Sequence, residues 1–301
     1  MLEVRAFEPD FLRRLDRLAL AIKRARSGRV GQRTLGRIQG IGIELENFKS
    51  YAEGDDLRFL DWNAMARLDD LLIRTYRATR QVEVTILIDA SASMGVPKTD
   101  DKLGFALLLG SALAYMGMGE SDAVRIVTFA MRRGAMQLAR TGFYSRRELY
   151  PDLKPFVLGV RPEGITQLAA MTDQLLLERR APGLLVLISD FLVDPADYEN
   201  ALTRLAAARH EIKAIHVMGD HESSGNFSAG MLRLRDSESG TIREVAMTAD
   251  SADRYRRRVE TMAQRLRDFC QRHAITYVRA FGAASVDQVI TREFPRLGVV
   301  V

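Results

Sequence analysis

From Val82 onward, short β-branched hydrophobic runs alternate with stretches of helical periodicity, and this alternation restricts the fold more than any other feature. Five of the runs are predicted to be buried strands: 82–89, 123–130, 183–190, 211–220 and 275–282. Helices are predicted at 101–118, 145–158, 167–180, 195–210 and 250–273. Strands that alternate with helices form a mostly parallel sheet covered by helices on both faces. We therefore predict a Rossmann-like α/β domain over residues 81–301.

Three segments fall outside this alternation. Residues 134–140 are expected to pair beside the second strand. Residues 220–249 hold two alternating runs around a Ser-Gly turn, which predicts an inserted β-hairpin. Residues 1–80 show no alternation, and we predict a basic helix at 10–26 and extended pieces around 54–76. We expect this N-terminal segment of 80 residues to pack on the α/β domain.

The sequence shows no signal for secretion or membrane insertion. Residues 1–18 carry charges throughout and lack the apolar stretch of a signal peptide. The longest uncharged stretch, 103–119, is shorter than the about 20 residues of a membrane helix. It contains four glycines and is predicted to be a buried helix. The single cysteine, Cys270, excludes an intrachain disulfide and a Cys-rich zinc site. We expect a cytoplasmic protein.

The positive charge is concentrated at the N-terminus. The chain carries a formal charge of +5, and residues 1–40 contribute ten Lys/Arg against four Asp/Glu. Such a helix can touch an acidic membrane surface or nucleic acid. No aromatic residues alternate with the arginines as a base-stacking surface requires, so we favour a solvated helix face. A nucleic-acid partner is not expected, and a peripheral membrane contact stays open.

Oxygen-bearing side chains follow two of the predicted strands and occupy one loop between them. In an open parallel sheet, ligands bind outside the carboxyl ends of the strands. The set contains no His or Cys, and oxygen-only ligation suits Mg²⁺, Mn²⁺ or Ca²⁺ rather than zinc. We predict a divalent metal site, with Mg²⁺ as the expected ion. Its candidate ligands are Asp89, Ser91, Ser93, Thr166 and Asp190.

The Asp-x-Ser-x-Ser spacing of Asp89, Ser91 and Ser93 suits such a site. A strand end that turns into a helix presents alternate side chains towards one point above the sheet. Neutral hydroxyl ligands leave the ion electrophilic, so it can accept an acidic oxygen from elsewhere. We therefore expect a protein partner that offers an Asp or Glu, and no small-molecule substrate.

The chain resembles a known metal site in these loops. The pattern resembles the metal-ion-dependent adhesion site of von Willebrand factor A (vWA) domains. It consists of a hydrophobic strand followed by Asp89-x-Ser91-x-Ser93, a later Thr166 and a later Ser189-Asp190. The threonine loop departs from that pattern, because it reads Glu-Gly-Ile-Thr rather than Gly-Gly-Thr. The resemblance implies a vWA-like fold and metal-dependent protein binding.

A second resemblance covers about residues 28–290. Three segments resemble the signature of the domain-of-unknown-function 58 (DUF58) family. They are Tyr51-x-x-Gly54-Asp55-Asp56-x-Arg58-x-x-Asp61-Trp62-Asn63-Ala64-x-Ala66-Arg67, then Ile73-Arg74, and Leu234 to Gly240. Members of this family are often encoded beside MoxR-type AAA+ ATPases and are thought to act with them. The resemblance implies a non-catalytic adaptor of such an ATPase in protein assembly, maturation or stress handling.

Other interpretations of these residues remain. Asp89 can act as a simple helix cap. A haloacid-dehalogenase phosphatase requires a second Asp where this chain has Ser91, and a serine hydrolase requires Gly-x-Ser-x-Gly or a His partner. We expect no enzyme, with a metal-dependent phosphohydrolase as the alternative. The charged block Gly54–Arg67 is either a partner surface or a salt-bridged clamp anchored by a buried Trp62, and we favour the clamp.

Overall fold

The computed structural model describes residues 2–27, 43–52, 60–68, 70–78, 82–119, 122–220, 230–235, 241–247, 249–281 and 289. The chain divides into two compact units, which we treat separately. The sheet unit comprises Met1–Arg29 and Val82–Val301, and the small unit comprises Val30–Gln81. The N-terminal basic helix therefore belongs to the sheet unit.

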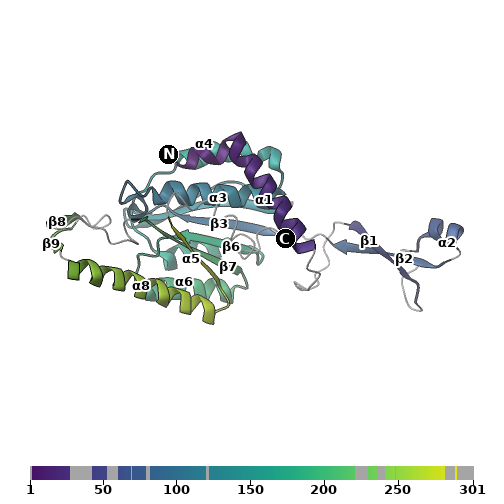
Figure 1. Cartoon of the computed structure of the whole chain (residues 1–301). Coiled ribbons are helices and arrows are strands. Elements are labelled where there is room, and N and C mark those ends of the chain that lie inside the picture. The colour runs from purple at the N-terminus through teal and green to yellow at the C-terminus, as the bar shows by residue number, and fades with distance from the viewer. Residues whose placement is uncertain are drawn as a thin grey trace. The chain divides into compact units, whose positions relative to one another are not determined.

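Six strands form the central sheet in the order β10-β7-β6-β3-β4-β5 (Figure 1). All neighbouring pairs are parallel except β4 and β5, which form an antiparallel hairpin. The strands are β3 (Glu83–Asp89), β4 (Ala123–Arg132), β5 (Ala135–Arg140), β6 (Leu184–Ser189), β7 (Glu211–Met218) and β10 (Thr276–Phe281). The five predicted strands and the added run at 134–140 are confirmed, with ends that shift by at most two residues.

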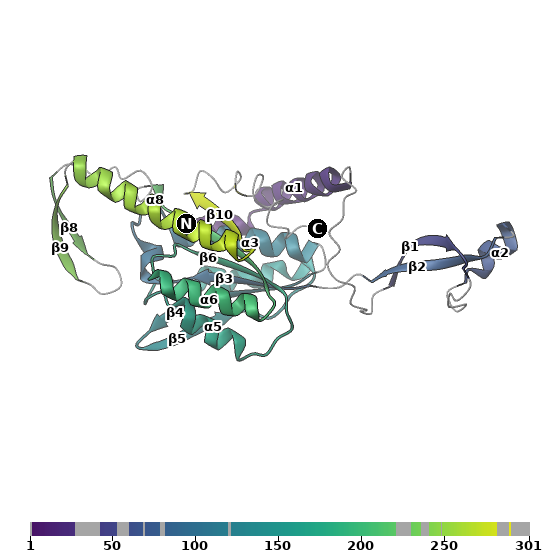
Figure 2. The same cartoon turned by 90° about the horizontal axis from the view of Figure 1, so that it is seen from below.

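Helices cover both faces of this sheet (Figures 1 and 2). One face packs under α1 (Pro9–Ser27), α3 (Lys102–Gly119) and α4 (Lys154–Gly159), and the other under α5 (Leu168–Leu176), α6 (Pro195–Ala207) and α8 (Ala249–Arg272). Short 3₁₀ helices lie at Leu2–Phe7 (η1), Ala92–Gly95 (η3) and Arg147–Leu153 (η4). Along β3, Ile86 and Ile88 pack with α3 while Leu87 packs with α5 and α6, as the period of two requires.

Helix α3 is the one described helix with the length and hydropathy to cross a membrane, and 94% of it is buried in the structure. It is apolar on all sides, as expected for a helix enclosed by the core. A Cβ on Gly110 would lie 2.7 Å from Ile88 Cδ1, so this glycine permits the close approach of helix and sheet. The predicted buried helix is confirmed.

The predicted hairpin insertion is also confirmed. Strands β8 (Gly230–Arg235) and β9 (Ile242–Met247) pair antiparallel, with Leu232 opposite Val245. Three helix boundaries differ from prediction, and α6 ends at Ala207 rather than at residue 210. The segment 145–158 begins as the 3₁₀ helix η4 because Pro151 cannot supply an amide to an α-helical turn. Helix α5 ends at Leu176 rather than at residue 180.

The small unit contains an antiparallel pair, β1 (Ile43–Ser50) and β2 (Leu72–Ala78), and the short helix α2 (Trp62–Leu68). The prediction of extended structure was wrong for α2, because the Asp61 carboxylate accepts the Ala64 amide at 3.1 Å and caps the helix. Trp62 is 64% exposed, and the clamp interpretation, which joins the two units, stays a prediction. Other residues of the block, Asp55, Asp56 and Arg58 among them, and the 28–42 stretch lie outside the described residues.

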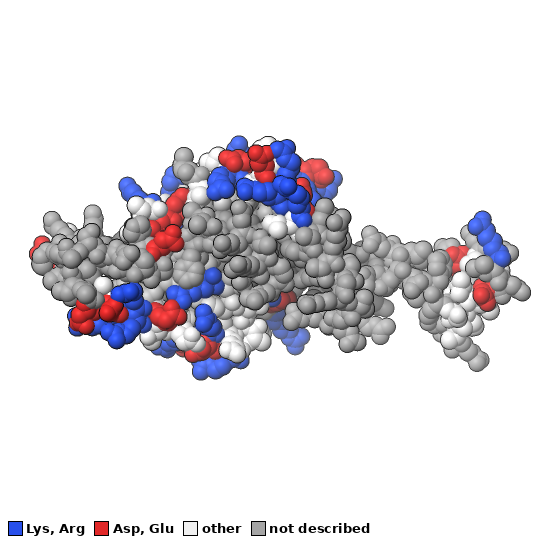
Figure 3. Space-filling model, in the orientation of Figure 1, with Lys and Arg blue, Asp and Glu red and all other residues white. Residues whose placement is uncertain are grey.

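Charges of both signs are interspersed on the helices of the sheet unit. Figure 3 shows basic and acidic side chains side by side where α8 lies in Figure 1. On α8, Arg254 pairs with Asp250 at 3.0 Å. On α1, Asp16 pairs with Arg147 at 3.0 Å, while Phe11 is buried in the core. One face of the basic helix is therefore a packing surface of the sheet unit.

Candidate metal centre

The candidate ligands meet at the carboxyl ends of β3 and β6. These strands are hydrogen-bonded neighbours, with Ile88 opposite Ile188, so the residues that follow each of them lie at one edge. The loop that carries Thr166 reaches this edge through paired backbone hydrogen bonds between Ile165 and Met131 of β4. The five candidate side chains are between 0% and 6% exposed: Asp89, Ser91, Ser93, Thr166 and Asp190.

Asp89 is the centre of the hydrogen-bond network. Its Oδ2 accepts the Thr166 hydroxyl at 2.9 Å and the Ser189 hydroxyl at 2.7 Å. Its Oδ1 accepts the Ser91 amide at 2.9 Å, and Ser91 Oγ lies 3.0 Å from Ser93 Oγ. The backbone contact to Ser91 is what a capping aspartate makes. A capping role does not account for the hydroxyls of Thr166 and Ser189, which come from distant loops. The network joins four of the five candidate ligands.

Asp190 joins this edge through a buried ion pair that the sequence analysis missed. Lys102 Nζ donates to Asp190 Oδ2 at 3.0 Å, and each side chain is 1% exposed. Lys102 begins α3 and is the charge that precedes the uncharged stretch 103–119. A lone lysine at the buried start of such a helix is the signal that could have identified it.

Two residues in the left-handed backbone region flank this ion pair. Asp101 precedes Lys102 with φ 43°, and Phe191 follows Asp190 with φ 50°. Asp101 also caps α3, since its Oδ1 accepts the Gly104 amide at 3.2 Å. The left-handed region is unfavourable for Phe191, whereas an aspartate such as Asp101 adopts it more readily, and backbone strain concentrates at functional sites. The Asp190 end of the ion pair is thus next to a strained backbone position.

The carboxylates are electrostatically unsatisfied. Burial, and next the charge of Asp190, raises the pKa of Asp89 from 3.8 to about 6. Two carboxylates face one ammonium group, so the fully ionised edge carries one surplus negative charge. A cation placed among these oxygens would relieve the repulsion that raises the pKa of Asp89.

No histidine of the described residues hydrogen-bonds a serine hydroxyl. His216 on β7 lies opposite Ser189, at the same edge, and burial lowers its pKa to about 4. Its Nδ1 hydrogen-bonds the Tyr277 hydroxyl at 2.8 Å. His216 is therefore a neutral packing residue, and His210 lies at the opposite edge with its Nδ1 accepting the Gly183 amide.

Gly164 explains why the Glu-Gly-Ile-Thr loop can deliver Thr166. It adopts φ +90°, and a Cβ there would lie 2.3 Å from the Met131 carbonyl oxygen. Its own carbonyl accepts the Ala92 amide at 2.9 Å, which ties the loop to the Asp-x-Ser-x-Ser turn. The glycine is thus present at the position where the backbone requires it.

We expect Gly164→Ala to lower the free energy of unfolding by about 2 kcal/mol, since the side chain adds both a strained φ and a backbone clash. Urea denaturation measures this loss. Gly134→Ala is the matched control, because Gly134 has φ +77° but open space around its Cα. Equal losses in both variants would show that the contact with Met131 is unimportant.

The residues present fit a hard divalent cation. Their polar atoms are carboxylate and hydroxyl oxygens, buried and within hydrogen-bond distance of one another. In the part of the chain that the structure describes, no cluster of three or more His, Cys, Asp or Glu residues exists. A zinc-type ligand set is therefore absent there, and the hydroxyl-rich edge is the candidate site.

Residues 47–268 match a family model described as "Protein of unknown function DUF58". The chain belongs to this family. It is 31% identical over 255 residues to "Uncharacterized protein Rv1480" of Mycobacterium tuberculosis (strain H37Rv), covering 83% of this chain and 78% of that protein. The same values hold for "Uncharacterized protein Mb1516" of Mycobacterium bovis. The family expected from the sequence is confirmed.

Solved structures also resemble the DUF58 chain. BatB from Bacteroides thetaiotaomicron is 16% identical, covers 72% of this chain and 98% of its own, and gives a TM-score of 0.43. The SpRpn10 VWA domain is 11% identical, covers 71% and 95%, and gives a TM-score of 0.40. The predicted fold class, a mostly parallel α/β sheet with helices on both faces, is the one observed.

Proposed function

We propose that this edge of the sheet binds a divalent cation, Mg²⁺ in the first instance, and through it an acidic side chain of a partner protein. The observation that carries the proposal is the buried oxygen network around Asp89, which joins three separate loops. Its ligands are Asp89, Ser91, Ser93, Thr166 and Asp190. The bound cation would supply an open coordination position for a carboxylate oxygen.

The residues of the chain prepare this position without the ion. Ser189 orients Asp89, and its Oγ also accepts the Phe191 amide at 3.0 Å. Asp197 of α6 accepts the Leu168 amide at 2.7 Å, which fixes the helix that follows Thr166. These contacts hold the ligand loops in place, so little ordering cost remains for binding.

Exposed apolar side chains beside the ligands support a protein partner. Val96 is 47% exposed two residues after the η3 residue Met94, and Leu192 is 44% exposed two residues after Asp190. A charged centre with apolar neighbours suits a protein contact that is partly desolvated, where a carboxylate–cation contact is stronger than in water.

The partner we propose is a MoxR-type AAA+ ATPase, because the chain belongs to the DUF58 family and family members are often encoded beside such ATPases. The chain would act as a non-catalytic adaptor in the cytoplasm, in protein assembly, maturation or stress handling.

Chelation of divalent metal by EDTA, or Ser93→Ala, is expected to weaken binding to a MoxR-type AAA+ ATPase from the same organism at least tenfold, about 1.4 kcal/mol. EDTA removes the cation, and Ser93→Ala removes one of its ligands. Calorimetric titration measures the affinity, and Ser145→Ala is a control serine outside the network.

Unchanged affinity in EDTA would show that the edge is structural, and the block Gly54–Arg67 would become the next candidate surface. Phosphate-ester turnover by the purified protein that disappears in Asp89→Asn would contradict the non-catalytic role and favour a metal-dependent phosphohydrolase.

A further inference from the structure

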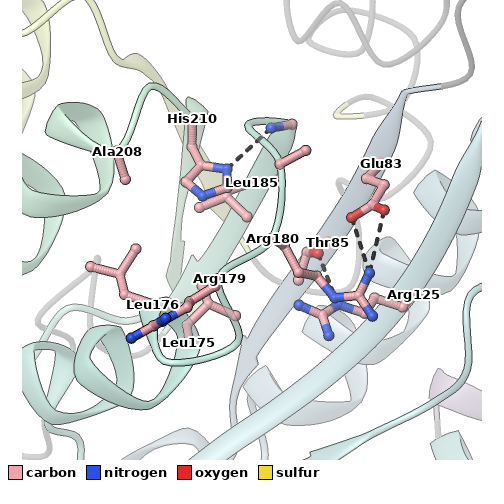
Figure 4. A pocket seen from close by; sticks show the side chains of 12 residues that line it. Glu83, Thr85, Arg125, Leu175, Leu176, Arg179, Arg180, Leu185, Ala208 and His210 are labelled. Carbon is pink, nitrogen blue, oxygen red and sulfur yellow. Dashed lines mark hydrogen bonds and ion pairs between the residues drawn. The ribbon is translucent and has the colours of Figure 1, made fainter.

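A second polar site lies at the opposite edge of the same sheet. A cavity of about 200 Å³ opens at the amino ends of β3, β6 and β7 (Figure 4). Glu83 and Thr85 of β3 line it, with Gly183 before β6 and His210 before β7. In a parallel sheet this edge is the one remote from Asp89, so the cavity is separate from the candidate metal centre.

Arginines on one wall of this cavity are fixed by glutamates. Arg125 is 4% exposed, donates from Nε to Thr85 Oγ1 at 3.0 Å and from Nη1 to Glu178 Oε2 at 2.7 Å. Arg180 pairs with Glu83 at 3.3 Å and with Glu178 at 3.4 Å. The two guanidinium groups stack on Phe143 at 4.8 Å and 4.5 Å. This wall is a rigid, prearranged basic surface.

Arg179 differs from the other two arginines that line the cavity. It lines the cavity, and no hydrogen bond or ion pair among the described residues engages its guanidinium group. It follows the end of α5 with φ 48°, in the left-handed conformation that glycine adopts most readily at helix ends. A glycine would satisfy the backbone better than arginine does. The arginine therefore costs stability at this position.

The charge balance selects the ligand. The lining of the cavity holds three arginines, Arg125, Arg179 and Arg180, against one glutamate, Glu83, and so a formal surplus of two positive charges. The C-terminal ends of α5 and α6 border the cavity and contribute about half a negative charge each. The net surplus of about one positive charge matches a singly charged anion better than a dianion.

The other wall is apolar and carries one further donor. Leu175, Leu176 and Leu185 line it, so an aliphatic chain can pack there. His210 Nδ1 accepts the Gly183 amide at 3.2 Å, which leaves Nε2 to carry the proton of the neutral ring. The cavity thus offers hydrogen-bond donors from Arg179 and His210 beside an apolar surface.

We propose that this cavity binds a small monocarboxylate with a short aliphatic chain, whose carboxylate pairs with the Arg179 guanidinium group. Planar two-point pairing is the geometry in which guanidinium and carboxylate groups bind best. The site is independent of the cation proposed at the other edge, and its test needs no metal.

Butyrate is the probe, titrated into the full chain in EDTA at constant ionic strength and followed by ligand-observed NMR. We expect saturable binding at about 1 mM, the order that a ligand of this size allows. Arg179→Gly should weaken it at least tenfold and leave the melting temperature unchanged or higher, because glycine relaxes the left-handed backbone.

Arg133→Gly is the matched control. Arg133 has φ 50°, lies in the β4–β5 turn and does not line the cavity, so the same substitution should leave butyrate binding unchanged. Equal binding of butyramide would show that charge is irrelevant and would overturn the proposal. Stronger binding of inorganic phosphate than of butyrate, or equal butyrate affinity in Arg179→Gly and wild type, would also overturn it.

Discussion

Replacing Lys102 by methionine is expected to destabilise the metal-free protein by about 3–5 kcal/mol, and a divalent cation is expected to restore most of that loss. The substitution keeps the length of the buried side chain but removes the ammonium group that lies 3.0 Å from Asp190 Oδ2. Asp89 and Asp190 are then two buried carboxylates with no cation. Urea denaturation with EDTA and with Mg²⁺ measures both effects.

The same substitution should raise the affinity for metal. In the wild type, a cation that uses Asp190 must compete with the Lys102 ammonium group for the same carboxylate. Without that competitor, we expect Mn²⁺ to bind at least tenfold more tightly in Lys102→Met, as measured by titration calorimetry. Lys102 would then set how strongly the edge holds its ion.

The double variant Lys102→Met with Asp190→Asn is the control. It removes both charges, so its metal-free stability should exceed that of Lys102→Met alone. It should gain little from Mg²⁺ because one ligand carboxylate is missing. If Lys102→Met is equally unstable with and without metal, no cation reaches Asp190, and the proposed ligand set is wrong.

The sequence placed the strands and the edge correctly because both follow from local patterns. Runs such as 82–89 and 183–190 are hydrophobic and β-branched, and each ends in polar residues. Parallel pairing then brings those residues to one edge, whatever the details of the loops. The Glu-Gly-Ile-Thr loop departs from the Gly-Gly-Thr pattern, but Gly164 still lets its backbone approach Met131 closely.

Contacts between distant residues could not be read in this way. Lys102 meets Asp190 across 88 positions, and Thr85 meets Arg125 across 40. Neither pair belongs to a local motif, and burial alone makes the lysine noteworthy. Helix α2 was missed for a different reason: its Asp61 cap stands among several acidic residues, so the sequence does not single it out.

Saturating Mg²⁺ or Mn²⁺ is expected to stabilise the wild type by about 2.7 kcal/mol at one hundred times the Kd. For a chain of 301 residues, this corresponds to a rise in melting temperature of about 4 °C. Asp89→Ala combined with Ser91→Ala should abolish the rise, because it removes the central carboxylate and a hydroxyl ligand. Differential scanning calorimetry measures the change.

Asp152→Ala combined with Ser145→Ala is the matched control, since it removes the same residue types outside the network. The control should keep the full metal-linked rise. If the Asp89→Ala, Ser91→Ala variant gains as much stability from Mn²⁺ as the wild type does, the ion binds elsewhere on the protein.

The dependence of this stabilisation on pH identifies Asp89 as the group involved. In the metal-free folded protein the pKa of Asp89 is about 6, above its ordinary value of 3.8. Protonated Asp89 therefore contributes fully to stability below pH 3.8, and this contribution is lost as the pH rises through 6. A metal ion binds the ionised carboxylate and reverses this trend. The metal-linked rise in melting temperature should therefore be small at pH 5, grow through pH 6 and reach its full size by pH 7. A rise of equal size at pH 5 and pH 7 would exclude Asp89 as a ligand, because a proton and a cation cannot share its buried oxygens.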